Sequence, residues 1–169
     1  ALEVQLAKEM RDGTTLALRP YQVDAARAFY AGGAVDAGSG VVVLPCGAGK
    51  TIVGMAAIAE VSASTLVLTT NTTAVRQWMD ELLDKTTLTE DQVGEYTGAA
   101  KNIRSVTIAT YQVLTHRQTK QDEFTHLGLF DAREWGLIIY DEVHLLPAPV
   151  FQATASLQAR RRLGLTATL

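Results

Sequence analysis

The fold of this chain is decided by residues 41–51, which read Val-Val-Val-Leu-Pro-Cys-Gly-Ala-Gly-Lys-Thr. The apolar run Val41–Leu44 predicts a buried strand, and the largely apolar stretch Lys50–Val61 predicts a helix packed against a sheet. Between them, Gly47 and Gly49 allow the backbone to turn its N–H groups towards a bound anion, where a side chain would obstruct the approach. The N-terminus of the helix adds a partial positive charge there. The stretch therefore predicts a phosphate-binding loop.

The end of this loop carries side chains that suit a nucleoside triphosphate. The Lys50 ammonium can reach the β- and γ-phosphates and the Thr51 hydroxyl can ligate Mg²⁺, so ATP and Mg²⁺ are the expected ligands. The residues predicted to bind the nucleotide here are Pro45, Cys46, Gly47, Ala48, Gly49, Lys50 and Thr51. The pattern G-x-x-x-x-G-K-[ST] has glycine where this chain has Leu44. A glycine-rich turn with an incidental lysine is the alternative, which the flanking strand and helix disfavour.

Other short apolar runs rich in β-branched residues predict further strands. The predicted strands are Val41–Leu44, Leu66–Thr69, Val106–Thr110, Leu137–Tyr140 and Leu163–Thr166. They lack polar alternation, as strands of a parallel sheet covered on both faces do. Because helical patterns separate them, the sequence predicts an α/β fold: a doubly wound, mainly parallel sheet with helices on both faces and ligands at the carboxyl ends of the strands.

Two more helices are predicted. Ala74–Leu83 has one apolar face, with Thr72 or Thr73 as its N-cap. A last helix is expected from Pro149 to about Gln158, with Val150, Phe151 and Leu157 pointing inward. The stretches expected to be loops are Ala31–Gly40, Glu95–Arg104 and His116–Glu123.

A second site-forming stretch follows the strand predicted at Leu137–Tyr140 and reads Asp141-Glu142-Val143-His144. Because parallel strands end at one edge of a sheet, these carboxylates are expected to face the phosphate loop. Asp141 would hold Mg²⁺ through a water molecule, and Glu142 would polarise the water that attacks the γ-phosphate. An acidic pair after an apolar run is often only a solvated strand end, but here it complements the lysine–threonine pair. The predicted catalytic residues are Lys50, Asp141, Glu142 and His144.

Several conspicuous residues are given structural rather than functional roles. Trp78 and Trp135 are expected to pack in the core or at the edge of the sheet. The run Arg160–Arg162 is expected to be a solvated helix end rather than a DNA contact. His116 and His126 lack the spacing of a zinc site.

Composition is that of one globular domain. The chain has 169 residues, 47% of them hydrophobic and 20% charged. The single cysteine, Cys46, excludes an internal disulfide framework and suits a reducing compartment, and no secretion signal or membrane span is evident. The formal net charge of −3 argues against binding nucleic acid by bulk electrostatics, but it leaves open a narrow track of contacts.

Beyond these motifs, the chain resembles the XPB family of superfamily 2, the xeroderma pigmentosum group B-type DNA helicases and translocases, from Leu18 onward. The stretches that carry the resemblance are Leu18–Gln22, Leu44–Thr51, Asn71–Trp78, Ala109–Leu114, Glu134–His144 and Arg162–Leu169. In that family Leu44 is the usual residue of the phosphate loop. Most other branches carry Ser-Ala-Thr where this chain has Thr166-Ala167-Thr168, or a DEAD or DEAH box where it has Asp-Glu-Val-His. The resemblance implies a first RecA-like helicase lobe over residues 18–169, with residues 1–17 as a lead-in segment.

The resemblance also implies roles for single residues. Gln22 would contact the adenine edge, and Arg19 would support it or lie on the ribose side. Thr166 and Thr168 would link His144 to the DNA track, so that hydrolysis and strand movement are coupled.

The same resemblance implies contacts with DNA. Thr70, Arg76 and Thr110 would contact backbone phosphates and so position a strand without reading its sequence. A second RecA-like lobe of the same chain would follow and complete the ATP site with arginines. The lobe alone is therefore expected to show little or no turnover.

The function implied is that of a DNA-dependent ATPase in DNA repair or transcription-linked duplex opening. A repair nuclease or subunits of a transcription–repair complex are the further partners that the family suggests, and no membrane is expected. The location would be the cytoplasm in a prokaryote or the nucleus in a eukaryote. The alternatives are an RNA helicase or a restriction-type DNA motor of the same superfamily, a small-molecule kinase with a phosphate loop, and a non-catalytic scaffold gated by nucleotide.

Overall fold

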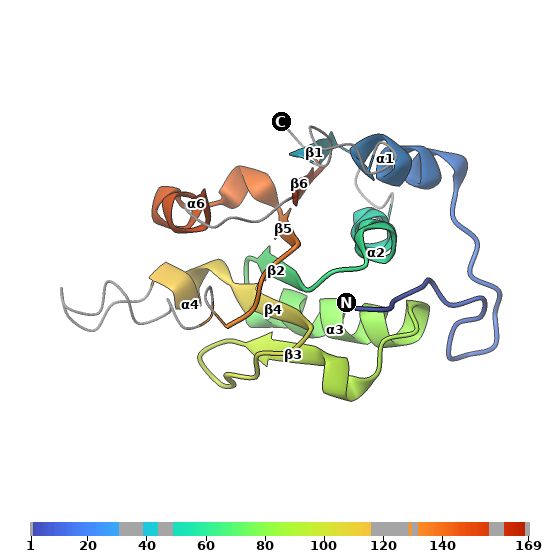
Figure 1. Cartoon of the computed structure of the whole chain (residues 1–169), viewed down its shortest axis with the longest axis horizontal. Helices are drawn as coiled ribbons and strands as arrows, with labels where there is room; N and C mark the ends of the chain where they lie inside the picture. Colours follow the sequence, from blue (N-terminus) through green and yellow to red (C-terminus); the bar gives the residue numbers. More distant parts are fainter. Residues whose placement is uncertain are drawn as a thin grey trace.

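The computed structural model describes residues 2–30, 39–43, 49–115, 129, 132–155 and 161–167. Its helices are α1 (Pro20–Tyr30), α2 (Lys50–Val61), α3 (Thr72–Lys85), α4 (Tyr111–Thr115) and α6 (Ala148–Ala155), with 3₁₀ turns η2 (Glu90–Gln92) and η4 (Val143–Leu145). Its strands are β1 (Ser39–Val43), β2 (Thr65–Thr69), β3 (Val93–Tyr96), β4 (Val106–Thr110), β5 (Leu137–Asp141) and β6 (Arg161–Thr166). Within this part of the chain the strands form one parallel sheet in the order β1-β6-β5-β2-β4-β3 (Figure 1).

Helices cover the sheet on both faces. Helices α1, α2 and α3 lie on one face, and α4 and α6 lie on the other (Figure 1). Side chains of one strand alternate between two apolar cores, since Val67 belongs to the core under α2 and α3, whereas Leu66 and Leu68 belong to the core under α4 and α6. This explains the absence of polar alternation in the strands and confirms the doubly wound α/β fold predicted from the sequence.

The register of the sheet aligns the carboxyl ends of the strands that matter for function. Val43, the last residue of β1, lies opposite Thr166 of β6. Asp141 at the end of β5 lies opposite Leu165, and Thr69 at the end of β2 lies opposite Thr110. The carboxyl ends of β1, β5 and β6 therefore lie at the same edge of the sheet.

The loop predicted at Glu95–Arg104 is wrong at its start, because Glu95 and Tyr96 belong to strand β3 and pair with β4. The four-residue strand contains Gly94 and no β-branched run, so its sequence gives little signal. A β-carbon at Gly94 would lie 2.1 Å from the carbonyl oxygen of Asn102, so the glycine lets the returning chain pass close to the strand. The loop predicted at Ala31–Gly40 also ends early, since β1 begins at Ser39.

The helix predictions need three corrections. The N-cap of α3 is Asn71, whose side chain accepts a hydrogen bond from the Ala74 amide, and not Thr72 or Thr73. Phe151 of α6 is 55% exposed, whereas its neighbour Val150 is buried. Two helices, α1 from Pro20 and α4 from Tyr111, were not predicted.

The prediction that the arginine run is a solvated helix end was wrong for Arg161 and Arg162, which belong to β6. The Arg162 guanidinium donates to the Tyr140 hydroxyl (3.1 Å) and to the Thr154 carbonyl (2.7 Å). Arg160, the end predicted for the last helix and the loop predicted at 116–123 lie outside the described residues.

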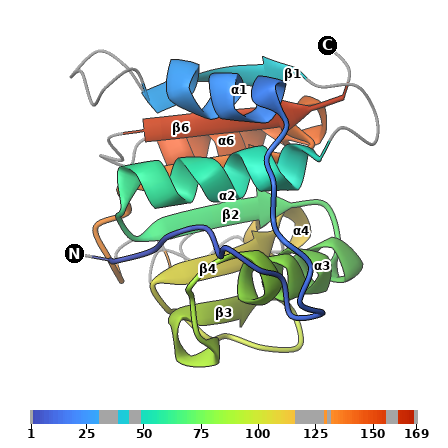
Figure 2. The same cartoon turned by 90° about the vertical axis from the view of Figure 1, so that its right-hand side faces the viewer.

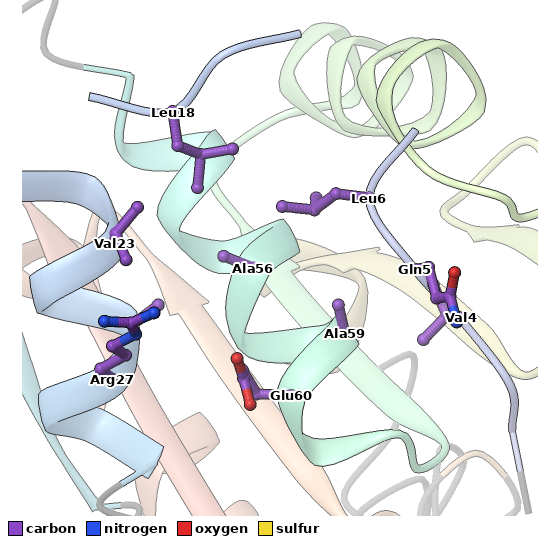
Figure 3. Close-up of a pocket in the computed structure, with 10 residues that line it drawn as sticks. Val4, Gln5, Leu6, Leu18, Val23, Arg27, Ala56, Ala59 and Glu60 are labelled. Carbon is purple, nitrogen blue, oxygen red and sulfur yellow. The ribbon is translucent and has the colours of Figure 1, made fainter. Parts of the chain in front are cut away.

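The lead-in segment packs on the outer side of α2 and α3 (Figure 2). Leu2 and Val4 are buried in the core under α2 and α3, and Ala7 donates to the Lys85 carbonyl (2.8 Å). Between this segment, α1 and α2 lies a cavity of about 420 Å³, into which Leu6, Leu18 and other small and apolar side chains project (Figure 3). None of the described helices is long and apolar enough to cross a bilayer.

Candidate active site

The centre of the candidate site is Lys50, the first residue of α2, which faces the acidic end of β5. Its Nζ atom lies 3.6 Å from Asp141 Oδ1 and forms an ion pair with Glu142 Oε1. The preceding Gly49 has φ 70°, a left-handed conformation that favours glycine. The sequence predicted that the lysine and the two carboxylates would meet across the carboxyl edge of the sheet, and the structure brings them together.

Asp141 is held in place by donors from three other elements. Its Oδ2 atom accepts hydrogen bonds from the Thr69 hydroxyl (2.9 Å) and from the Trp78 indole N–H (3.1 Å). Its main-chain carbonyl accepts a hydrogen bond from the Tyr111 hydroxyl (2.7 Å). Burial, and secondarily the charge of Asp141, raises the pKa of Tyr111, so this hydroxyl stays a donor.

Glu142 adopts an uncommon backbone conformation. Its φ of 53° and ψ of 53° lie in the left-handed region, which costs a residue with a β-carbon about 1–3 kcal/mol. Glu142 lies between two cationic or protonatable groups, since Oε1 pairs with Lys50 and Oε2 lies 3.5 Å from His144 Nε2. Strain of this kind is typical of functional sites, where surrounding structure holds a residue in a set position.

His144 connects the acidic end of β5 to the end of β6. Its Nδ1 atom lies 2.9 Å from the hydroxyl of Thr166, which is buried. A β-carbon at Gly164 would lie 3.1 Å from the Val143 side chain, so the glycine lets η4 pack closely over β6. The His144–Thr166 contact was expected from the family resemblance. Thr168 lies outside the described residues.

The stretch predicted to read adenine lies against the phosphate-loop end. Gln22 is 3% exposed, and its Nε2 atom donates to the Gly49 carbonyl (3.4 Å) while its Oε1 atom accepts from the Arg19 amide (2.8 Å). A β-carbon at Gly49 would lie 2.5 Å from Gln22 Nε2, which is a second reason for glycine there. The Arg19 guanidinium donates to the Tyr21 hydroxyl (3.2 Å).

The residues that the structure describes at this site include oxygen ligands suited to Mg²⁺. Thr51 lies beside Lys50 in the first turn of α2 and is partly exposed. The Thr51 hydroxyl and the Asp141 carboxylate are hard oxygen ligands, which Mg²⁺ prefers, and it commonly binds through one or two carboxylates together with substrate phosphates. No cluster of three or more His, Cys, Asp and Glu residues that could hold a metal occurs within the described ranges. Pro45, Cys46, Gly47 and Ala48 lie outside those ranges.

The residues predicted to contact DNA differ in exposure. Arg76 is exposed on α3 and forms an ion pair with Glu95 (3.7 Å). Thr70 is partly exposed, and its hydroxyl accepts from the Asn71 side chain (3.3 Å). Thr110 is buried and its hydroxyl accepts from the Val113 amide (3.2 Å), so a contact between this hydroxyl and a phosphate would require that bond to open.

Trp78, Thr69 and Tyr111 were not predicted as site residues. The helical pattern placed Trp78 on the apolar face of its helix, and its burial is confirmed, but no periodicity can show that its indole N–H meets a carboxylate 63 residues away. Thr69 is the last residue of one predicted strand, and Asp141 follows the end of another. These two positions at strand ends were the one feature of the sequence that could have indicated their contact.

Solved structures show the same fold. The UvsW helicase of bacteriophage T4 matches 96% of this chain with a TM-score of 0.65 at 18% identity, over 57% of its own chain. The Hef helicase domain of Pyrococcus furiosus matches 89% of this chain with a TM-score of 0.67 at 20% identity, over 33% of its own chain.

Sequence relatives are much more similar. Proteins named DNA 3'-5' helicase XPB from Kineococcus radiotolerans and Mycobacterium tuberculosis are 66% and 64% identical, each over 90% of this chain and 26% of the relative. A general transcription and DNA repair factor IIH helicase/translocase subunit XPB of Danio rerio is 41% identical over 92% of this chain and 20% of its own length. The chain thus spans about a quarter or less of these relatives.

The family described as type III restriction enzyme, res subunit, matches residues 15–169, which include the lysine of α2, the acidic end of β5 and the end of β6. The XPB relatives cover 90% of this chain at much higher identity than the helicase structures do. The chain therefore belongs to the family described as type III restriction enzyme, res subunit, and its sequence is similar to those of the XPB helicases named above.

Proposed function

We propose that this chain is the ATP-binding lobe of a DNA-dependent ATPase, and that it works within a longer protein that translocates along DNA or opens it. The observation that carries the proposal is the meeting of Lys50 with Asp141 and Glu142 at the carboxyl edge of a parallel sheet. A cation at the start of a helix and two carboxylates at the end of a strand are the groups that bind a triphosphate, hold its metal and orient a water molecule.

Each described group has a part in the proposed hydrolysis. Lys50 would exchange its carboxylate partners for the β- and γ-phosphates of ATP, and Thr51 and Asp141 would hold Mg²⁺. When bound, Mg²⁺ neutralises charge on the phosphate oxygens. Glu142 orients a water molecule and accepts its proton as the water oxygen bonds to the γ-phosphorus and the bond to the β–γ bridging oxygen breaks. Gln22 and Arg19 lie at the same loop end and would contact the base and ribose.

The proposed nucleic-acid partner is DNA, bound through its backbone without sequence preference. The names of the XPB relatives support DNA over RNA. The matched family is described by a restriction-enzyme subunit, but the 66% and 64% identity to XPB helicases favours an XPB-type motor over a restriction-type one. A role in DNA repair or transcription-linked opening is proposed from the name of the Danio rerio relative. Subunits of such a complex, or a repair nuclease, would be its partners, in the cytoplasm of a prokaryote or the nucleus of a eukaryote.

We further propose that a second RecA-like lobe lies in the remainder of the parent protein. The length of the relatives supports this, since the chain spans 26% of the two bacterial ones. Arginines from that lobe would complete the ATP site and raise the rate by roughly 10³–10⁵. Residues 18–169 are then the first lobe and residues 1–17 its lead-in.

Binding of ATP to this chain, measured by calorimetry with and without Mg²⁺, tests the site. Lys50→Ala should weaken MgATP binding by roughly 10- to 100-fold, because charge-assisted hydrogen bonds to phosphate contribute about 1.5–3 kcal/mol. Glu142→Gln should retain binding, since its role is in hydrolysis. Lys8→Ala, which removes an exposed lysine of the lead-in, is the matched control and should bind like the wild type. Equal MgATP affinity in wild type and Lys50→Ala would reject the proposed site.

A further inference from the structure

The carboxylate of Asp141 is divided between two environments. Its Oδ2 atom accepts two hydrogen bonds, from the Thr69 hydroxyl (2.9 Å) and from the Trp78 indole N–H (3.1 Å). Its Oδ1 atom lies towards Lys50 Nζ (3.6 Å). An indole N–H can only donate, so it favours an accepting oxygen at this position and fixes the rotation of the carboxylate. One oxygen is therefore held in the protein interior and the other is presented to the site.

The helix that begins at Lys50 is shaped to hold the indole in place. A β-carbon at Gly54 would lie 2.6 Å from the ring atom Cη2 of Trp78 and 3.3 Å from a methyl group of Leu165. Glycine in a helix interior costs about 0.8–1 kcal/mol relative to alanine. Gly54 therefore destabilises helix α2 but leaves space for the Trp78 ring. Trp78 is 2% exposed, so its ring is enclosed by packed neighbours.

The other tryptophan provides a comparison within the same molecule. Trp135 is similarly buried, and its indole N–H also makes one hydrogen bond of 3.1 Å, but the acceptor is the main-chain carbonyl of Leu129. The indole N–H of Trp135 thus finds its acceptor in the main chain, as the N–H of a buried tryptophan usually does. Packing alone does not account for Trp78, because its N–H meets a charged oxygen of the candidate site.

We propose that Trp78 is a positioning residue for the metal–nucleotide site. With Thr69, it holds Oδ2 of Asp141 so that Oδ1 is the oxygen offered to Mg²⁺ and kept in line with Lys50. This inference rests on the proposed function, in which Asp141 helps to hold Mg²⁺. Partners that orient a metal-binding carboxylate commonly contribute 10- to 100-fold to metal affinity.

The first test compares two tryptophan-to-phenylalanine variants of this chain, each of which removes one buried indole N–H. The quantity measured is the ratio of ATP affinity in Mg²⁺ to ATP affinity in EDTA. Trp78→Phe should lower this ratio by roughly 10- to 100-fold and leave the affinity in EDTA unchanged. Trp135→Phe should leave both unchanged. An unaltered ratio in folded Trp78→Phe would overturn the inference.

The second test leaves Trp78 in place. In Trp135→Phe, Trp78 is the sole tryptophan, and its fluorescence should change on addition of MgATP but not on addition of ATP in EDTA. Gly54→Ala, which fills the space that the ring occupies, should lower the Mg²⁺-dependent affinity ratio in the same direction as Trp78→Phe. These two measurements decide the inference if Trp78→Phe does not fold, and a silent Trp78 together with an unaltered Gly54→Ala ratio would overturn it.

Different results would reject the proposed function and the positioning role of Trp78. If the wild-type chain binds no ATP in either buffer, the proposed function fails. If the wild type binds ATP with a clear dependence on Mg²⁺ and Trp78→Phe shows the same dependence, the function stands and the positioning role of Trp78 fails.

Discussion

Glu142 shows how single residues are constrained by this site. Its left-handed backbone turns the chain sharply after β5, so that its carboxylate reaches Lys50 and His144 instead of continuing along the strand. Two hydrogen bonds hold the residues around it. One joins His144 to Thr166, and in the other Tyr111 donates to the Asp141 carbonyl. The side chains that meet at the candidate site, Lys50, Asp141, Glu142 and His144, could be predicted from the sequence. Their support by Thr69, Trp78 and Tyr111 could not, because these contacts depend on which strands and helices become neighbours.

The His144–Thr166 contact should act as one unit in the two-lobe parent protein. His144→Ala and Thr166→Val are each expected to reduce stimulation of ATP hydrolysis by DNA while leaving MgATP affinity unchanged. Because both remove the same hydrogen bond, the double variant should be no worse than the poorer single one, with a coupling energy of roughly 0.5–3 kcal/mol. The measurement is DNA-stimulated turnover of the four proteins, and simple addition of the two effects would contradict a shared role.

Tyr111 should make the stability of this chain sensitive to alkaline pH. Its pKa is raised above the ordinary value of 10.0 in the folded state, first by burial and then by the nearby Asp141. The folded state therefore keeps a proton that the unfolded state loses, so stability is full below about pH 10 and falls as the pH rises above it. Tyr111→Phe should reduce the alkaline slope of the unfolding free energy by about one proton, roughly 1.4 kcal/mol per pH unit. Urea unfolding from pH 9 upward measures this, and an identical slope in the variant would contradict it.

At the scale of elements, strands and helices with a continuous apolar run are predicted correctly from the sequence. Elements whose structure depends on contacts with other parts of the chain are predicted poorly. The predicted strands and helix α2 are confirmed, apart from Leu44, which lies outside the described residues. Strands β2, β4, β5 and β6 contribute apolar side chains to the buried cores, as their apolar runs predict. Strand β3 was missed because pairing with β4, rather than β propensity, determines it. Val150 and Phe151 were both placed inward, but only Val150 is buried, because helical periodicity does not fix which of two adjacent apolar residues faces the sheet in an eight-residue helix.

The start of α3 gives a test of element stability. Asn71 caps this helix by accepting a hydrogen bond from the Ala74 amide (2.8 Å). Asn71→Ala should therefore lower the free energy of unfolding by about 1 kcal/mol, within a range of roughly 0.5–2 kcal/mol. Thr73→Ala, two residues further into the first turn, is the control, and it should have no destabilising effect because alanine favours a helix. Urea denaturation measures both, and a larger loss in Thr73→Ala would contradict the assignment of the cap.

At the scale of the whole molecule, the sheet order explains why distant motifs form one site. Strand β6 lies between β1 and β5, so the ends of all three strands meet at one edge, with Thr69 of β2 beside them. The sequence alone could predict that edge, since every predicted strand was of the buried parallel type. It could not predict the order of the strands, which sets the contact between His144 and Thr166 and places Trp78 under Asp141.

The most direct test of the account is ATP hydrolysis by the parent protein with duplex DNA, single-stranded DNA and RNA compared side by side. The account predicts slow turnover by this chain alone, strong stimulation of the two-lobe protein by DNA over RNA, and loss of that turnover in Glu142→Gln by roughly 10²–10⁴-fold. A parent protein whose hydrolysis ignores DNA, or responds equally to RNA, would contradict it.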